Sequence, residues 1–151
     1  MNREPAQPRV RQLRVIVEAT DWEQAVAFYR DVLGLPEQAA FEGEGDARIA
    51  ILHAGSATLE LSNPAQMRMI DGIETEDWTG ARIRLAFEVD DTHEVVDDLV
   101  EGGARLVSPA RETPWRSLNA RLEAPADLEL TVFQELETLD ERSQRPGFTA
   151  S

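Results

Sequence analysis

The sequence has no cysteine among its 151 residues. This absence excludes thiolate zinc sites, iron–sulfur clusters and cysteine nucleophiles. Basic side chains are also few, with 15 Lys and Arg against 29 Asp and Glu, and the formal net charge is -14. Because this charge repels nucleic acids and anionic membrane surfaces, neither is an expected partner. A neutral or cationic small molecule, or another protein, is the expected kind of partner.

Long apolar runs are missing as well. The N-terminal segment contains arginines and prolines but no apolar stretch of signal-peptide length, and no stretch reaches the length of a transmembrane helix. We therefore expect a cytoplasmic protein. Residues 1–12 and 137–151 contain few large apolar side chains and are predicted to be a flexible arm and a flexible tail.

Between these ends, strand-like and helix-like hydrophobic periods alternate. In the first half they predict a strand at 13–18, a helix at 22–33 capped by Thr20 or Asp21 and ended by Gly34, and strands at 38–42, 48–53 and 57–62. After an acidic connector, 71–80, the same order returns at an offset of about 70 residues. It predicts a strand at 82–89, a helix at 92–101, and strands at 105–108, 117–123 and 128–134. The predicted fold is α+β, with fused βαβββ modules at 13–70 and 81–136.

Most of the predicted strands have one apolar and one polar face. Two helices can cover only the apolar faces, so the polar faces are expected to share a wet side that forms a cup if the sheet curls. This polar set contains no Lys, unlike an ordinary solvated face of a sheet. Its members are Arg14, Glu18, Thr58, Glu60, Ser62, Arg82, Arg84, Glu88, Ser117, Asn119, Arg121, Glu129 and Thr131.

Residues Thr20–Leu35 resemble the first-helix signature of the vicinal oxygen chelate superfamily, which includes glyoxalase I, extradiol dioxygenases and bleomycin resistance proteins. The resemblance continues in family order through Leu59-Glu60-Leu61, Pro114-Trp115 and Ala124-Pro125-Ala126-Asp127, and it covers residues 13–135. It implies two βαβββ modules whose curved mixed sheet surrounds a cleft, with the helices outside. It also implies a homodimer.

In the metal-dependent members of this superfamily, a His on the first strand and a Glu on the last strand of each half bind the metal. The resemblance places Arg14 and Glu60 at these positions in the first half, and Arg84 and Thr131 in the second. Three of the four ligands are absent, and the two arginines would repel a dication. We therefore expect no metal and no other cofactor, with Glu60 paired to Arg14 or Arg84 instead. The alternative is that Glu129 replaces a missing carboxylate ligand.

Several side chains of the polar set are candidates for contact with an organic ligand. Glu60 is either a ligand-contacting or proton-transferring carboxylate, or a structural ion-pair partner. The guanidinium groups of Arg14 and Arg84 suit planar anions. Trp115 either stacks on a flat ligand or packs as a corner residue, while the amide of Asn119 can both donate to and accept from a ligand. The predicted ligand-binding residues are Arg14, Glu60, Arg84, Trp115, Asn119, Arg121, Glu129 and Thr131, and Glu60 is the candidate catalytic residue.

Two functions are compatible with this set. The first is a metal-independent protein that binds an aromatic or cationic, antibiotic-like small molecule in its cleft, as drug-sequestering bleomycin resistance proteins do. The missing metal ligands and the negative net charge favour it. The second is a glyoxalase-like lyase, isomerase or epimerase in which Glu60 is the base and Arg14 and Arg84 stabilise an oxyanion. A dimeric scaffold with a vestigial cleft is a third reading.

Overall fold

The computed structural model describes residues 14–58, 60, 62–76, 78, 80–138, 140, 141 and 144. The predicted arm, 1–12, lies outside these residues, as does most of the predicted tail, 137–151. The elements are α1 (Trp22–Val26), the π-helix η1 (Ala27–Val32), β1 (Glu37–Glu42), β2 (Arg48–Leu52), α2 (Pro64–Thr75), β3 (Leu85–Glu88), α3 (Thr92–Glu101), β4 (Arg105–Glu112), β5 (Ser117–Ala124) and β6 (Leu128–Glu135). Within the described ranges, none of the helices has both the length and the apolar character needed to cross a bilayer.

Capping residues start both predicted helices. Asp21 accepts a hydrogen bond from the Gln24 amide at 3.1 Å before α1, and Asp91 accepts one from the Glu94 amide at 3.1 Å before α3. η1 continues α1 in the wider π form and is followed closely by Gly34, whose φ of +88° is a conformation that favours glycine. Both predicted helices are thus confirmed.

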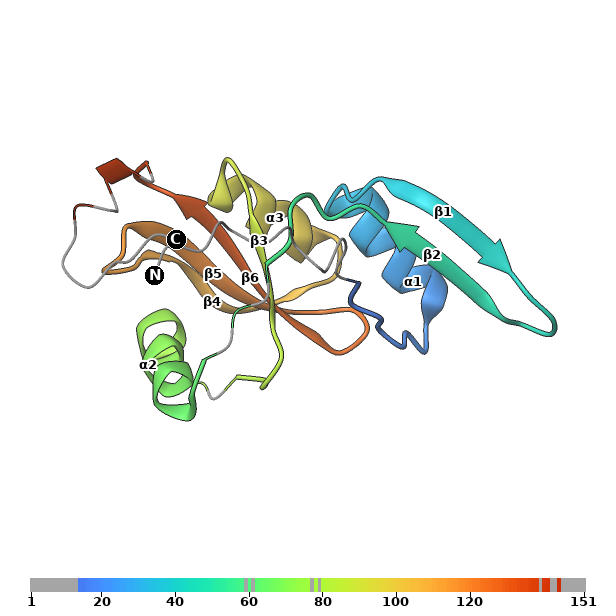
Figure 1. Ribbon diagram of the computed structural model, residues 1–151, viewed down its shortest axis with the longest axis horizontal. Helices are drawn as coiled ribbons and strands as arrows, with labels where there is room; N and C mark the ends of the chain where they lie inside the picture. Colours follow the sequence, from blue (N-terminus) through green and yellow to red (C-terminus); the bar gives the residue numbers. More distant parts are fainter. Residues whose placement is uncertain are drawn as a thin grey trace, which may run out of the picture.

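The second half of the chain forms the predicted βαβββ unit. Its strand order is β3-β6-β5-β4, in which β3 runs parallel to β6 and the other pairs are antiparallel. β3 begins at Leu85 rather than Arg82, and β4 continues to Glu112 instead of ending at Ser108. The predicted mixed α+β fold is confirmed. In Figure 1 this sheet has α3 on one side and α2 on the other.

The apolar face of this sheet packs against α1, η1 and α3 and makes the core. Burying one of its large side chains stabilises the fold by about 1.5–3 kcal/mol. The Tyr29 hydroxyl of η1 donates a hydrogen bond to the Pro125 carbonyl at 2.8 Å, which ties the helix to the β5–β6 turn, and burial raises the pKa of Tyr29. The core consists of Ala25, Phe28, Tyr29, Val96, Leu99, Ala104, Ala120, Leu122, Leu130 and Val132.

The first half of the chain departs from the prediction. β1 and β2 form an antiparallel hairpin that is a separate two-stranded sheet in the described structure, and it extends beyond α1 (Figure 1). Residues 14–18 are exposed and are not in a strand, and neither are the described residues of 57–62. Leu59 and Leu61 lie outside the description. Alternation alone does not make a strand, because a strand is stabilised by hydrogen bonds and side-chain pairs with a neighbour.

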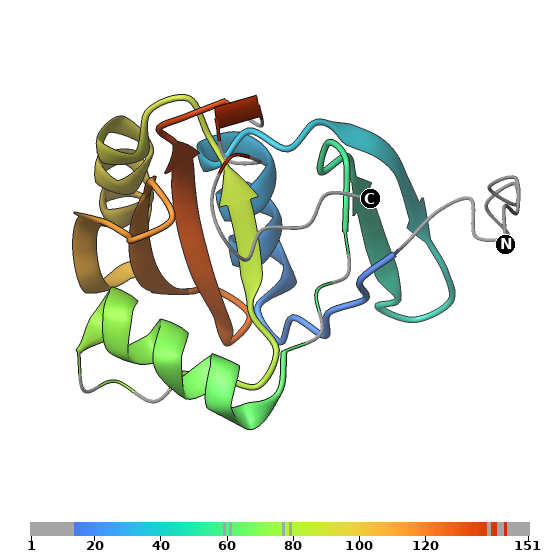
Figure 2. The ribbon, with the colours of Figure 1, turned by 60° about the vertical axis from the view of Figure 1, so that its left-hand side comes forward.

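A helix replaces much of the predicted acidic connector. α2 runs from Pro64 to Thr75, so the predicted module boundary at residue 70 lies inside it. Asn63 caps α2 by accepting a hydrogen bond from the Gln66 amide at 2.9 Å, and Pro64 lies in the first turn, where no amide donor is needed. Figure 2 shows α2 by the lower ends of the strands of this sheet, and α2 contacts β4 and β5. α2 is not one of the two predicted helices, which pack on the apolar face, and it covers part of the polar face.

Candidate ligand-binding site

The polar face of β5 and β6 is buried beneath α2. Ser117, Asn119 and Arg121 of β5 point away from the apolar core, and Glu129 and Thr131 of β6 lie beside them. All five residues are buried, and Arg121 is 0% exposed. The predicted assignment of these side chains to one polar face is confirmed. The predicted solvent exposure of that face is wrong, because α2 covers it.

Arg121 is the centre of an ion-pair network. Its Nη1 donates to Glu129 Oε1 at 2.7 Å and to Asp71 Oδ1 at 3.1 Å, and its Nη2 donates to Glu74 Oε1 at 3.0 Å. Asp71 and Glu74 are neighbours on one side of α2, so both carboxylates reach the sheet. Burial alone would lower the pKa of Arg121, but the charge of Glu74 and the hydrogen bonds with the carboxylates raise it overall. Arg121 is therefore a cation under all ordinary conditions.

Arg84, just before β3, extends the network. Its Nη1 donates to Asp71 Oδ1, and its Nη2 lies 3.1 Å from Met67 Sδ. Both partners belong to α2, so Arg84 and Arg121 together hold this helix against the sheet. The network contains two guanidinium groups and three carboxylates, those of Asp71, Glu74 and Glu129.

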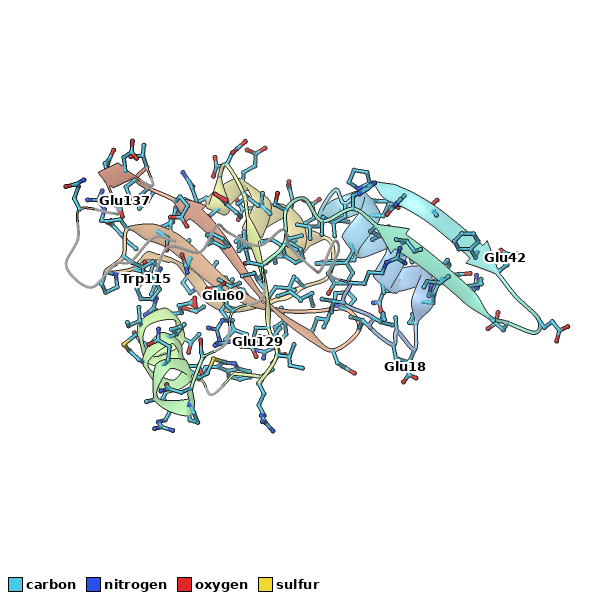
Figure 3. All side chains as sticks on the ribbon, viewed as in Figure 1. Glu18, Glu42, Glu60, Trp115, Glu129 and Glu137 are labelled. Carbon is cyan, nitrogen blue, oxygen red and sulfur yellow. The ribbon has the colours of Figure 1, made fainter. Side chains whose placement is uncertain are left out.

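A chain of neutral polar groups leads from the network to the β4–β5 turn. Asn119 Nδ2 donates to Glu74 Oε2 at 3.2 Å, and Ser117 Oγ donates to Asn119 Oδ1 at 2.6 Å. The hydroxyl oxygens of Thr113 and Ser117 are 2.9 Å apart. Trp115 is half-buried in this turn, at the end of the molecule where α2 lies, whereas Glu18 lies toward the opposite end (Figure 3). Asn119 and Trp115 are therefore at one end of the buried polar face.

Both carboxylate oxygens of Glu129 are engaged. Oε1 accepts from Arg121 and from Trp78 Nε1 at 3.1 Å, and Oε2 accepts from the Ala81 amide. Gly80 passes so close that a Cβ atom on it would lie 2.6 Å from Glu129 Oε1 and 2.9 Å from Arg121 Nη1. The segment after α2 is thus fitted around the Glu129–Arg121 pair, and Gly80 allows this approach.

We predict that Gly80→Ala destabilises the protein by about 1–3 kcal/mol, because the added methyl group meets two charged groups that hold each other in place. Gly72→Ala is the matched control, since a Cβ on Gly72 meets no heavy atom within 4 Å and Gly72 lies inside α2. That substitution is expected to leave stability unchanged or raise it by up to about 1 kcal/mol. Urea unfolding of both variants measures the difference, and an equal effect at the two positions would contradict the described packing.

Asp71 gives the network a dependence on pH. Burial by itself would raise the pKa of Asp71, but the hydrogen bond from the Gly80 amide at 3.2 Å and the charges of Arg121 and Arg84 outweigh it and hold the pKa below its ordinary value. Because the pKa of Asp71 is lower in the folded state, its ionised carboxylate stabilises the fold at every pH above its ordinary pKa. This stabilisation is lost as the pH falls through the folded-state pKa.

We therefore predict that wild-type stability falls more steeply in acid than that of Asp71→Asn, which has no carboxylate to protonate there. The free energy of unfolding, measured in urea from pH 7 to pH 2, gives the two slopes. Asp97→Asn, an exposed change on α3, is expected to keep the wild-type slope. Identical slopes for the wild type and Asp71→Asn would overturn the prediction.

The positions that the resemblance assigns to metal ligands do not fit a divalent metal. Arg84 brings a cation into the network, and Thr131 lies opposite Arg121 in the strand register. Arg14 and Glu60 are both exposed. Glu129, the alternative ligand, is held by Arg121 and two other donors. Over the described ranges, no group of three or more His, Cys, Asp or Glu side chains is arranged to hold a metal ion.

The predicted pairing of Glu60 with Arg84 is wrong. Arg84 pairs with Asp71, and Glu60 has no hydrogen bond or ion pair with another residue in the part of the chain that the structure describes. An ion-pair network does form on the polar face, but its carboxylates are those of Asp71, Glu74 and Glu129. Of the predicted ligand-binding residues, the structure brings together Arg84, Asn119, Arg121, Glu129 and Thr131.

Sequence reasoning missed Asp71 and Glu74. The available signal was their three-residue spacing after Asn63 and Pro64, a capping residue followed by a first-turn proline, which together indicate a helix with both carboxylates on one side. The acidic content of residues 71–80 instead indicated a connector between the two modules. Their arginine partners are distant in sequence, so no local pattern reveals the pairing.

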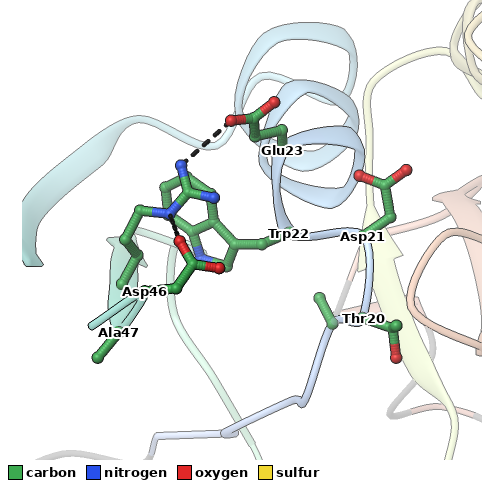
Figure 4. A pocket seen from close by; sticks show the side chains of 8 residues that line it. Thr20, Asp21, Trp22, Glu23, Asp46 and Ala47 are labelled. Atoms are coloured by element: carbon green, nitrogen blue, oxygen red, sulfur yellow. Dashed lines mark hydrogen bonds and ion pairs between the residues drawn. The ribbon is translucent and has the colours of Figure 1, made fainter.

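A hollow of about 740 Å³ lies at the start of α1 beside the β1–β2 turn (Figure 4). Its aromatic ring, Trp22, is covered by the Arg48 guanidinium carbon at 4.5 Å from the ring centre. Arg48 also pairs with Glu23 at 3.1 Å and with Asp46 at 3.8 Å. The ring and the main charges of this exposed hollow therefore already have partners within it.

The family model of the Glyoxalase/Bleomycin resistance protein/Dioxygenase superfamily matches residues 11–130. The uncharacterized protein YraH of Bacillus subtilis (strain 168) is 28% identical over 129 residues, which are 83% of this chain and 97% of that protein. The fold is similar to that of TnmS3, an antibiotic binding protein from Streptomyces sp. CB03234, with a TM-score of 0.55 and 19% identity over 85% of this chain and 99% of the other. A superfamily member from Sphaerobacter thermophilus DSM 20745 gives a TM-score of 0.51 and 21% identity over 80% and 92% of the two chains. This chain is a member of the Glyoxalase/Bleomycin resistance protein/Dioxygenase superfamily.

Proposed function

We propose that this protein binds an aromatic or cationic small organic molecule on the polar face of its four-stranded sheet, without a metal ion, and that it sequesters this molecule. The observation that carries the proposal is the convergence of Arg84, Asn119, Arg121, Glu129 and Thr131 on one face. The similarity of the fold to the antibiotic binding protein TnmS3 supports the proposal by analogy.

Two tryptophans at this face support an aromatic ligand. Trp78 donates its indole N–H to Glu129, and Trp115 lies in the β4–β5 turn beside the polar chain of Ser117 and Asn119. Aromatic rings prefer offset-stacked or edge-to-face contact with other rings, and each such contact stabilises a complex beyond the area it buries.

A thermal-shift panel tests the proposal, with flavins, aromatic natural products and cationic antibiotics in one block and divalent metals in another. A ligand at a hundred times its dissociation constant adds about 2.7 kcal/mol of stability, which raises the melting temperature by several degrees. We expect organic hits that Asn119→Ala weakens and that Asp46→Ala, in the hollow beside α1, leaves unchanged. Hits that depend on Asp46 and not on Asn119 would place the site at that hollow instead.

The alternative function, a glyoxalase-like lyase, isomerase or epimerase with Glu60 as base and Arg14 and Arg84 around an oxyanion, has less support. Arg84 already pairs with Asp71, and Glu60 is exposed. Glu60→Gln separates the two functions. Under the proposed function, the wild type and the variant bind the panel hit equally well and neither turns it over. An enzyme of this kind would turn the compound over as the wild type, and Glu60→Gln would keep binding and lose that turnover.

We also propose that the protein is a homodimer that covers the β1–β2 hairpin. An isolated two-stranded hairpin is marginally stable in water, and this one exposes an adjacent apolar pair, Phe41 at 60% and Ile49 at 45%. A second copy would bury these side chains and pair with a strand edge. Sedimentation equilibrium is expected to give twice the chain mass for the wild type and the chain mass for Phe41→Glu. A monomeric wild type at micromolar concentration would contradict this.

A further inference from the structure

Two carboxylates of α2 occupy the donors of the sheet in the way that a bound anion would. Asp71 and Glu74 accept hydrogen bonds from both terminal nitrogens of Arg121, and Glu74 also accepts from Asn119. Asp71 accepts from Arg84 as well. Each terminal nitrogen of a guanidinium can donate to a carboxylate oxygen, so a molecule with two carboxylates could use the same donors.

The arrangement leaves two buried polar atoms without a hydrogen-bond partner in the described structure, Arg121 Nε and Ser108 Oγ. Ser108 of β4 lies directly opposite Arg121 of β5 in the strand register, so both side chains are on the face that α2 covers. Arg121 is completely buried and Ser108 is 2% exposed. Unpaired buried donors are costly, so α2 satisfies this face incompletely, and an additional acceptor atom here would complete it.

The charges of the face favour an anion. Without α2, the sheet presents Arg84 and Arg121 against the single carboxylate of Glu129, an excess of one positive charge. With α2, Asp71 and Glu74 reverse this to an excess of one negative charge. An organic dianion in place of the helix would give the same balance. The net charge of -14 repels anions only at long range, since exposed charges are screened within about 8 Å at physiological ionic strength.

We propose that Asp71 and Glu74 of α2 occupy the site of a ligand. The ligand is an aromatic molecule that carries two neighbouring carboxylate groups, and its binding displaces α2 from the sheet. One carboxylate replaces Asp71 on Arg84 and Arg121, and the other replaces Glu74 on Arg121 and Asn119. An oxygen of the ligand accepts from Arg121 Nε and Ser108 Oγ, and Trp115 contacts the ring. This inference rests on the proposed function and narrows its ligand class.

Isothermal titration of the full chain with phthalate, an aromatic dicarboxylate, tests the inference. The double variant Asp71→Asn/Glu74→Gln weakens the hold of α2, so the binding-competent fraction rises, and we expect phthalate to bind at least about tenfold more tightly than to the wild type. Asp97→Asn/Asp98→Asn, with the same change of charge on exposed positions of α3, is expected to leave the affinity within about twofold. Arg84→Met is added to the double variant, in which Asp71 no longer provides a carboxylate to Arg84, and is expected to weaken phthalate binding about tenfold or more relative to that double variant.

Hydrogen exchange distinguishes a ligand that displaces α2 from a ligand that only stabilises the folded protein. A ligand that binds beside a docked α2 slows exchange across the protein, whereas one that displaces α2 accelerates exchange in residues 64–75 while protecting β5 and β6. Phthalate that binds with slower exchange in α2, or with equal affinity in the double variant, would overturn the displacement.

Different binding results would overturn this inference and the proposed function. Binding of benzyltrimethylammonium or a neutral aromatic compound at the Asn119-dependent site, with no binding of phthalate, would overturn the dicarboxylate class and leave the proposed function standing. The absence of Asn119-dependent binding by any compound would overturn both.

Discussion

Replacing Arg121 with Met is expected to lower the stability of the protein by about 3–5 kcal/mol. The substitution removes one cation and leaves the buried carboxylates of Glu74 and Glu129, and the nearby Asp71, without their shared donor. Breaking a buried ion pair from one side has this cost because the remaining charge stays in a poorly solvated place. In a chain of this length, each kcal/mol lowers the melting temperature by roughly 2–4 °C. Circular dichroism during heating measures the effect.

Arg30→Met is the matched control. Arg30 pairs with Asp31 at 2.8 Å and with Glu37 at 3.3 Å, but these pairs are exposed, and losing them is expected to cost no more than about 1 kcal/mol. Arg121→Lys keeps the positive charge but loses the two terminal nitrogens that donate to different carboxylates, so it separates the contribution of the charge from that of the hydrogen-bond geometry. We expect an intermediate loss for Arg121→Lys. Equal losses for Arg121→Met and Arg30→Met would mean that the network does not hold the fold together.

Replacing Leu99 with Ala is expected to cost about 2–5 kcal/mol. Leu99 of α3 is 0% exposed in a core that also contains Val96 of α3, Ala104 and residues of α1, η1, β5 and β6. Truncation removes the transfer free energy of the side chain and leaves a cavity that its neighbours fill only partly. Urea unfolding gives the difference in free energy between the variant and the wild type.

The neighbouring residue on α3 gives the comparison. Val100 is 42% exposed, so Val100→Ala is expected to change stability by less than about 1 kcal/mol. A similar loss at both positions would show that α3 does not pack with the face described here.

Local signals account for the parts of the fold that the sequence predicts. α3 has Asp91 before its first turn and Gly102 after its last, and its bounds match the prediction. The alternation of β5 and β6 assigns Asn119, Arg121 and Glu129 to one face, because successive side chains of a strand must point to opposite faces. These features depend on neighbours within a few residues.

The missed features depend on partners far along the chain. The burial of Asp71 and Glu74 against the sheet relies on Arg121, about 50 residues away, and on Arg84. The alternating residues 14–18 have the pattern of a strand, yet they lie outside any strand because a neighbour, and not a pattern, makes a strand. Periodicity shows which side chains share a face, and it does not show what covers that face.

The most direct test of the account is the distance between α2 and α3 in solution, since the central claim is that α2 is held on the polar face by Arg121. Because the chain has no cysteine, Arg68→Cys on α2 and Asp98→Cys on α3 accept spin labels at those two exposed positions alone. Double electron–electron resonance is expected to give one narrow distance distribution, which broadens when Arg121→Met is added. A broad distribution in the presence of Arg121, unchanged by its removal, would contradict the account.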